Sequence, residues 1–357
     1  MNILFIAGTW NKEGGKPSGL IEKMYNSLLS KMKTEDHIDY FNGGNYDNLE
    51  SIINTVTNYD VIFWMANVPN DLPKVRDVKK ANPFAILIGS KRNIDNEYSF
   101  VDILNRTLLQ RHNLSIMFSK SSSEKEYTMT LFDPLGTAWY EGKSTDELMA
   151  ALVKRVRFLL TTTRKRTYQV PGDVLIPNNE EFIKYVREVA EIFHETIQHS
   201  DGVTRFLGNS SFRGEGNVIY VSERDVDKST IDIDHFVAAF TEDNTTYYYG
   251  DKKPSKDTIV QTYLYKAFPN INYIVHSHCY TEGGAWTMTP VPCGSLDELT
   301  EITYAMKDYN DDYSGTYYKV NLKGHGCLIL GSTLEEMKQT KYITRELPER
   351  IYLQENT

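Results

Sequence analysis

The 357-residue sequence has few cysteines, no surplus of positive charge and no long apolar run. Its three cysteines are odd in number and no signal peptide precedes them, so we expect reduced thiols in a cytoplasmic protein. The net charge of −9 argues against a nucleic-acid partner or an anionic membrane surface. No apolar segment approaches the roughly 20 residues that a membrane-spanning helix needs.

The first part of the chain alternates between apolar runs and amphipathic segments. Asn2 to Ala7 predicts a buried strand, and a helix is expected from about Leu20 to Met32. Further strands are predicted at 37–41, 60–65, 84–88 and 114–118, with helices at 48–57, 99–111 and 144–160. This alternation is typical of a doubly wound parallel α/β domain, which we assign to residues 1–165.

The glycine-bearing loop from Gly8 to Gly19 lacks the patterns of a nucleotide-binding loop. It contains no G-x-G-x-x-G, and its Gly15-Lys16 pair is followed by Pro17 instead of the Ser or Thr of a P-loop. The amides near Gly14, Gly15 and Ser18 would nevertheless favour an anion, because they precede a helix N-terminus. The alternative is a purely structural turn.

A change in composition separates the two halves of the chain. Threonines, basic residues and Pro171-Gly172 predict a linker at 166–178. A helix with apolar residues at helical spacing is expected over 180–199, followed by short strands that include 271–276 and 327–330, and by a final helix over 333–345. We therefore assign residues 179–357 to a second domain.

Two histidines alternate along the apolar segment from Ile271 to His278. Because successive side chains of a strand point to opposite faces, His276 and His278 share one face. Two imidazoles on one face can chelate a divalent cation, and His325, flanked by two glycines, offers a third nitrogen. Three such ligands leave a coordination position for a substrate, as in catalytic metal sites. Alternatively, the paired histidines are ordinary polar residues at a strand end.

The surrounding motifs occur in a characteristic order. Gly208-Asn209-Ser210-Ser211 is followed by Lys253-Pro254-Ser255-Lys256-Asp257, by the segment Tyr265–His278, and by Gly324-His325-Gly326. Over about 180–345 the sequence resembles the class II (zinc-dependent) aldolase family of sugar-phosphate aldolases, ribulose-phosphate 4-epimerases and methylthioribulose-phosphate dehydratases. The resemblance implies a three-layer α/β/α domain, a homotetramer, and a divalent metal on the three histidines. Zinc is the expected ion, although three imidazoles suit several cations.

The resemblance also implies two proton-transfer groups. Asp257 lies where aldolases of the family carry Glu and the epimerases carry Asp followed by Thr, as in Asp257-Thr258. A carboxylate there can move a proton, although Asp257 can also be interpreted as the N-cap of the next helix. Tyr352 is the candidate for a tyrosine acid/base that the epimerases carry close to the C-terminus.

The motifs that hold the substrate phosphate in this family are only partly present. Gly208, Asn209 and Ser255 match, whereas Lys256 replaces a second serine. Where relatives have Thr-Pro-Ser-Gly, this chain has Ser222-Glu223-Arg224-Asp225. Arg224 and Lys256 would bind a larger or more charged anion, or would be occupied by the neighbouring carboxylates.

The sequence thus predicts a divalent-metal-dependent class II aldolase-type lyase or epimerase. Its substrate would be a small sugar phosphate or sugar-like anion, converted by aldol cleavage or retro-aldol epimerisation. The alternative is a non-catalytic binding or assembly module, because the adducin head domain resembles this fold without the metal ligands. The N-terminal domain would bind a second portion of the substrate or serve assembly.

Overall fold

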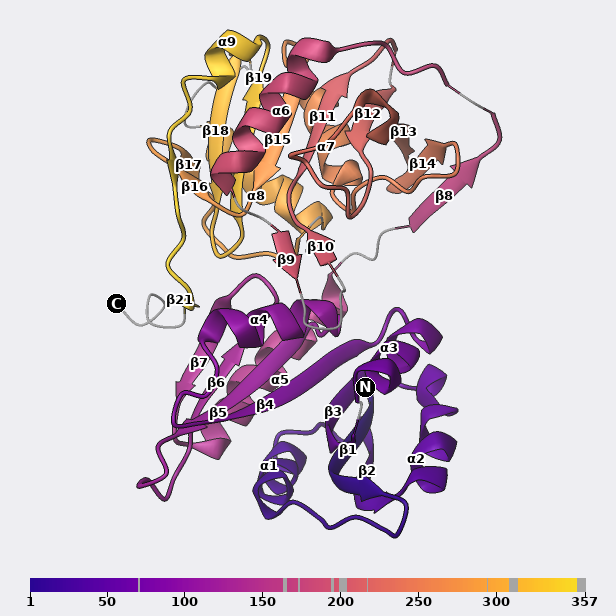
Figure 1. Cartoon of the computed structure of the whole chain (residues 1–357), viewed down its shortest axis with the longest axis vertical. Helices are drawn as coiled ribbons and strands as arrows, with labels where there is room; N and C mark the ends of the chain where they lie inside the picture. Colours follow the sequence, from indigo (N-terminus) through magenta and orange to yellow (C-terminus); the bar gives the residue numbers. More distant parts are fainter. Residues whose placement is uncertain are drawn as a thin grey trace. The chain divides into compact units, whose positions relative to one another are not determined.

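The chain folds into two compact α/β units (Figure 1). The first consists of Met1–Thr161 and Leu347–Thr357, and the second of Thr162–Glu346. The last residues therefore return to the first unit, whereas the sequence analysis assigned them to the second domain. The computed structural model describes residues 1–69, 71–162, 166–172, 174–193, 196–198, 204–216, 218–293, 295–307 and 314–351. Within these ranges, no helix combines the length and the apolar character needed to cross a membrane.

An eight-stranded sheet forms the centre of the first unit. Its strands are β1 (Asn2–Asn11), β2 (His37–Asn45), β3 (Val61–Asn67), β4 (Ile86–Ile94), β5 (Leu114–Lys120), β6 (Thr128–Phe132), β7 (Thr137–Gly142) and β21 (Glu349–Arg350). They are ordered β2-β1-β3-β4-β5-β6-β7-β21, and the first five run parallel, as predicted. The antiparallel strands β6 and β7 were not predicted, and they extend this parallel core at one edge.

Helices cover both faces of this sheet. They are α1 (Gly19–Leu29), α2 (Tyr46–Ile53), η1 (Val56–Asn58), α3 (Asp71–Ala81), α4 (Phe100–Leu109) and α5 (Thr145–Thr161). Apolar residues of α1 and α5 share one core cluster with β1 and β3, and those of α2 and α3 share another. Strand residues that alternate between two such clusters are buried on both faces, which explains the continuous apolar runs in the sequence.

The glycine loop after β1 is held by its own hydrogen bonds. The amide of Gly15 donates to the carbonyl of Gly44 at 2.9 Å, and the amide of Ser18 donates to Oδ1 of Asn42 at 2.8 Å. Two of the amides that were candidates for anion binding are therefore already satisfied within the protein. This arrangement favours the structural turn over the anion site.

A nine-stranded sheet forms the centre of the second unit. Its strands are β8 (Arg166–Val170), β11 (Asn209–Arg213), β12 (Ile219–Ser222), β13 (Phe236–Glu242), β14 (Thr245–Tyr249), β15 (Tyr273–Ser277), β17 (Ala285–Trp286), β18 (Tyr317–Leu322) and β19 (Gly326–Gly331). The order is β17-β18-β19-β15-β11-β12-β13-β14-β8. The predicted linker at 166–178 is thus partly wrong, because β8 pairs in parallel with β14.

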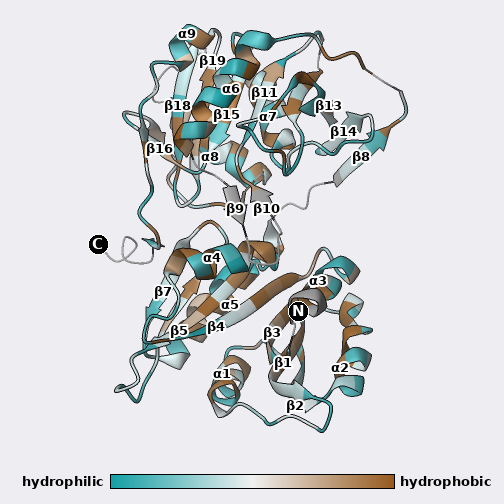
Figure 2. Cartoon of the chain, in the orientation of Figure 1, coloured by the Kyte–Doolittle hydropathy of each residue, from teal (hydrophilic) through white to brown (hydrophobic). Residues whose placement is uncertain are grey.

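Helices make this unit three-layered. They are α6 (Glu180–Phe193), η2 (Ile233–His235), α7 (Thr258–Ala267), α8 (Leu296–Lys307) and α9 (Leu334–Met337). Two short strand pairs lie outside the main sheet: β9 (Thr196–Gln198) with β10 (Thr204–Phe206), and β16 (Tyr280–Thr281) with β20 (Tyr342–Ile343). One core cluster joins α7 and α8 to the sheet, and another joins α6 and α9. Figure 2 shows hydrophobic and hydrophilic residues alternating along α6, as expected of a helix with one face on a sheet. The predicted final helix over 333–345 is shorter, because β20 pairs with β16 instead.

Gly89 in β4 is expected to be essential for the stability of the first unit. A β-carbon at this position would lie 1.9 Å from Cε1 of His112, whose buried ring is held by Ser115. We expect Gly89→Ala to lower the free energy of unfolding by about 1–3 kcal/mol, because the close-packed core cannot accept the added atom without moving. Urea unfolding followed by tryptophan fluorescence tests this, since three of the four tryptophans lie in this unit.

Gly19→Ala is the matched control, because a β-carbon there meets no atom within 4 Å. This variant should unfold at the same urea concentration as the natural chain or slightly above it. Equal midpoints for Gly89→Ala and Gly19→Ala would contradict the packing assigned to His112.

Candidate metal centre

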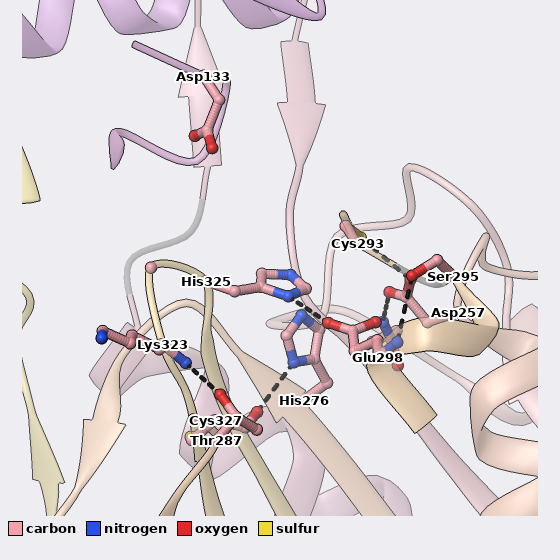
Figure 3. Close-up of polar contacts among 12 residues, drawn as sticks. Asp133, Asp257, His276, Thr287, Cys293, Ser295, Glu298, Lys323, His325 and Cys327 are labelled. Carbon is pink, nitrogen blue, oxygen red and sulfur yellow. Dashed lines mark hydrogen bonds and ion pairs between the residues drawn. The ribbon is translucent and has the colours of Figure 1, made fainter. Parts of the chain in front are cut away.

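Three histidines converge at one end of the central strands of the second unit. Figure 3 shows two of them, His276 and His325, side by side. His276 lies on β15 and His278 follows that strand, while His325 lies in the turn between β18 and β19. One ring nitrogen from each histidine lies within 4.8 Å of the others. The ring centroids are separated by 4.6 Å between His276 and His325, and by 5.3 Å for the other two pairs. Strand pairing therefore assembles the three side chains that the sequence nominated as ligands.

Hydrogen bonds to Nδ1 orient two of these rings. Nδ1 of His276 lies 2.9 Å from the carbonyl oxygen of Cys327, and Nδ1 of His325 lies 2.7 Å from Oε1 of Glu298. Both oxygens accept hydrogen bonds, so Nδ1 carries the proton and Nε2 of a neutral ring keeps its lone pair. In the described part of the chain neither Nε2 has a hydrogen-bond partner, although both are buried. The Nε2 lone pairs of His276 and His325 are thus available, and the imidazole of His278 lies beside them. Three such nitrogens fit the ligand set of a metal ion.

Glu298 is a further candidate site residue, which the sequence did not reveal. It lies in the first turn of α8, where its amide donates to the hydroxyl of Ser295 at 3.2 Å, and only 2% of its surface is exposed. Its carboxylate accepts the proton of His325, the arrangement by which proteins orient metal-binding imidazoles. The only available signal was an acidic residue near the start of a helix, which usually serves the helix dipole.

Asp257 is bonded to side chains beside the histidines and not to the start of its own helix. Its Oδ2 accepts from Nδ2 of Asn209 at 2.7 Å, and its Oδ1 accepts from the thiol of Cys293 at 3.1 Å (Figure 3). It occupies the N-cap position of α7 without a capping side-chain hydrogen bond. Gln261 from the same helix donates to Oδ1 of Asn209, which fixes that amide. The carboxylate is therefore held in place by side chains, while the residue keeps the N-cap position that the sequence allowed.

Burial and neighbouring groups shift the pKa values of the three histidines in different directions. Burial, followed by the nearby His325, lowers the pKa of His276 to about 4. Burial and the other two histidines lower the pKa of His278 well below its usual value. Burial also acts to lower the pKa of His325, but Cys293 and the Glu298 carboxylate outweigh it and raise that pKa well above the ordinary value. The cluster thus favours one positive charge held between imidazoles and carboxylates, which a proton or a metal ion can supply.

The segments that were expected to bind substrate meet next to Asp257. An isolated β-bridge joins Glu223 to Pro254, which places the Arg224 segment beside the start of α7. Nη2 of Arg224 donates to the carbonyl of Pro254 at 3.4 Å, while Glu223 pairs with Lys252 at 3.5 Å. The hydroxyl of Ser255 accepts from the amide of Asp257 at 3.3 Å.

Three further residues were predicted for the site: Gly208, Lys256 and Tyr352. Gly208 immediately precedes β11 and has a φ of +69°, so it turns the chain into the strand that carries Asn209. Lys256 is exposed at the start of α7. Tyr352 lies outside the described residues, so its assignment as an acid/base stays a prediction.

Comparison with known sequences identifies relatives of the second unit. Residues 187–349 match the family described as class II aldolase and adducin N-terminal domain. A methylthioribulose-1-phosphate dehydratase of Picosynechococcus sp. is 36% identical over 70 residues, which is 20% of this chain and 33% of that protein. Another, from Sodalis glossinidius, is 23% identical over 157 residues, which is 37% of this chain and 78% of the relative. The chain thus spans one third of the first of these relatives and most of the second.

Solved structures resemble parts of the chain. A DNA/pantothenate metabolism flavoprotein from Streptococcus pneumoniae has a TM-score of 0.34 and 13% identity, covering 44% of this chain and 97% of that structure. An L-fuculose 1-phosphate aldolase has a TM-score of 0.33 and 15% identity, covering 44% of this chain and 76% of the aldolase. At such identities the likeness concerns the fold alone.

Glu298→Gln is expected to weaken metal binding without unfolding the protein. The amide keeps the shape of the side chain but loses the charge that polarises His325. Loss of such a partner lowers metal affinity by about 10–100-fold. Competition with a chromogenic zinc chelator measures this change.

Asp297→Asn is the control, because it removes an exposed carboxylate from the same helical turn. It should leave the zinc affinity unchanged. If both variants retain the affinity of the natural chain, Glu298 has no role in the metal centre.

Proposed function

We propose that this chain is a divalent-metal-dependent lyase, because residues 187–349 match the family described as class II aldolase and adducin N-terminal domain. One observation carries the proposal: the ligand nitrogens of His276, His278 and His325 lie within 4.8 Å of one another. A non-catalytic adducin-like module would have no use for such a cluster. Zinc is the metal that we propose, because a set of three imidazoles suits it.

The metal and the surrounding protein groups would divide the chemistry between them. When bound by the three histidines, a divalent metal stabilises negative charge on substrate oxygens. Glu298 would keep the His325 ring in its orientation through the 2.7 Å hydrogen bond. The carbonyl of Cys327 does the same for His276. These contacts hold two of the ligands in place before any substrate arrives.

Asp257 is the residue that we propose to move a proton. Its Oδ1 and Oδ2 each receive a hydrogen bond, from Cys293 and Asn209 respectively, so its orientation is fixed. A positioned carboxylate can remove a proton next to a carbonyl group or return one to the product. Aldol cleavage, retro-aldol epimerisation and the dehydration named for the two relatives all require such a transfer. We favour aldol cleavage or retro-aldol epimerisation, in keeping with the motif order, and dehydration is the nearest alternative.

The proposed substrate is a small sugar phosphate or a similar anion. Asn209 and Ser255 contact Asp257, and Arg224 lies on the segment joined to the start of α7 by the bridge at Pro254. An arginine fork and the amides of a helix N-terminus are suited to a phosphate group. Lys256, exposed at the same helix start, would add a further positive charge.

The proposal also includes a homo-oligomer, most simply a tetramer. Family members are typically cyclic tetramers whose sites lie between subunits, and closed cyclic symmetry is common among soluble assemblies. A mass equal to one chain by light scattering at micromolar concentration would remove this part of the proposal. The first unit would serve assembly or bind another part of the substrate.

Metal analysis of the purified protein tests the central proposal. We expect about one divalent metal ion per chain in the natural protein, and loss of most of it in His276→Ala with the fold retained, because an open catalytic site contributes less to folding than a closed structural one. Elemental analysis and circular dichroism measure the two quantities. His37→Ala, an exposed histidine of the first unit, is the control and should keep its metal. Absence of stoichiometric metal from the natural protein would favour the non-catalytic module.

Asp257→Asn should separate metal binding from turnover. The amide retains the shape of the side chain but is not basic, so we expect full metal occupancy and a turnover lowered by about 100-fold or more. Steady-state kinetics on a panel of sugar phosphates, with elemental analysis of the same samples, measures both. An unchanged rate in this variant would leave Asp257 with a structural role only.

A further inference from the structure

A cavity of about 530 Å³ lies along one face of α6, beside the candidate metal centre. The helix contributes Val186, Val189, Ala190 and Phe193, which follow the spacing i, i+3, i+4 and i+7 of a single helical face. α6 packs over β11 and β15 through a shared core cluster (Figure 1). The volume is in the range of about 300–1,000 Å³ that is usual for small-molecule sites, so the space can hold a group of several carbon atoms.

The wall of this cavity is continuous with the candidate metal centre at the ends of two strands. Asn209 begins β11 and pairs with His276 near the end of β15, and both residues line the cavity. Their neighbours Ser210 and Val275 also line it, from the face of the sheet that packs on α6. Successive residues of a strand point to opposite faces, so a cavity that touches both pairs reaches around the strand ends. A molecule held at the histidines can therefore extend into it.

The surface of the cavity is mostly apolar. Phe206 and Leu207, which precede β11, complete the wall that α6 and Val275 begin. A hydroxylated sugar carbon or a charged group placed there would lose its hydration without an adequate replacement. An apolar group would instead gain by leaving water. The wall therefore selects a part of the substrate that is not sugar-like.

The charged residues of the wall do not favour a second anionic group. Glu191, Asp227 and Lys228 line the cavity, and together they supply two negative charges and one positive charge. The positive charge lies towards the histidines: burial and the neighbouring histidines lower the pKa of His278, and Lys228 adds to this effect. The phosphate is thus better placed at the Arg224 segment, and the group that enters the cavity is neutral.

One hydroxyl group interrupts the apolar wall. Ser210 is 1% exposed, and its Oγ has no hydrogen-bond partner within the described ranges. The hydroxyl of Ser222 is engaged elsewhere, because it accepts from the amide of Ser210 at 3.1 Å. A buried hydroxyl without a partner is costly to the folded state, so a bound group with a single acceptor atom at this point would be accommodated.

We propose that the substrate of the metal centre carries a neutral, apolar arm that occupies this cavity while its oxygen atoms lie at the three histidines. The inference rests on the proposed metal-dependent function. It narrows the substrate class from any small sugar phosphate to one that is extended by an apolar group of several atoms. The arm lies against α6, and one acceptor atom within it meets the hydroxyl of Ser210.

Two hydroxamic acids test this inference, because a hydroxamate chelates zinc through two oxygens and so anchors a probe at the metal centre. Acetohydroxamic acid carries only a methyl group, whereas 3-phenylpropanohydroxamic acid carries an apolar arm. Isothermal titration calorimetry on the zinc-loaded full chain measures both affinities. We expect the probe with the arm to bind about tenfold more tightly or better, because its phenyl group is removed from water. Ala190→Trp should abolish this difference, because the indole fills the cavity, and acetohydroxamic acid should still bind.

Glu188→Trp is the matched control, because it adds the same indole to α6 at an exposed position outside the described lining of the cavity. It should retain the preference for the probe with the arm. Ala190→Met replaces Ala190→Trp if the larger side chain prevents folding, and circular dichroism checks the fold of each variant.

The outcomes separate the arm from the metal centre. If the natural chain binds zinc and both hydroxamates with equal affinity, the arm is refuted and the metal centre stands. An undiminished preference in a folded cavity-filling variant would refute the arm as well. Failure of the natural chain to bind zinc would instead remove the proposed function, and the arm with it.

Discussion

The candidate metal centre depends on a close approach between the backbones of β15 and β19. A β-carbon on Gly326 would lie 2.0 Å from the carbonyl oxygen of Ser277 and 2.7 Å from Cα of His278. Only a residue without a side chain lets β19 begin so close to the end of β15. This approach brings the turn that carries His325 beside the two histidines of the neighbouring strand. The orientation of His276 by the carbonyl of Cys327 follows from the same strand pairing.

Two helices bring carboxylates, which carry negative charge, close to the three histidines. Glu298 comes from α8 and Asp257 from the start of α7, and both helices pack on the same face of the sheet. Each carboxylate has its own hydrogen-bond partners, His325 for Glu298 and Asn209 with Cys293 for Asp257. The proposed division of labour rests on this separation, because one carboxylate orients a ligand while the other remains available to the substrate.

The sequence revealed those parts of the site that are encoded locally. The period of two in His276 and His278, and the glycines beside His325, were readable because each is a short-range pattern. Glu298 and Cys293 were not, since their roles arise only when α8 and the preceding loop pack against the sheet. The same limit applies to the fold. The sequence of β8 predicts a linker, because only its tertiary pairing with β14 makes this segment a strand.

The return of the chain to its first unit has a consequence for folding. β21 pairs with β7, and Arg350 bonds to Glu141, 209 residues earlier in the sequence. In chain order the second unit is thus an insertion within the first. During synthesis the parallel core of the first unit can form early, but its sheet can gain this edge strand only after the whole second unit has been made. A first unit whose sheet includes β21 therefore implies that the second unit has already been synthesised in full.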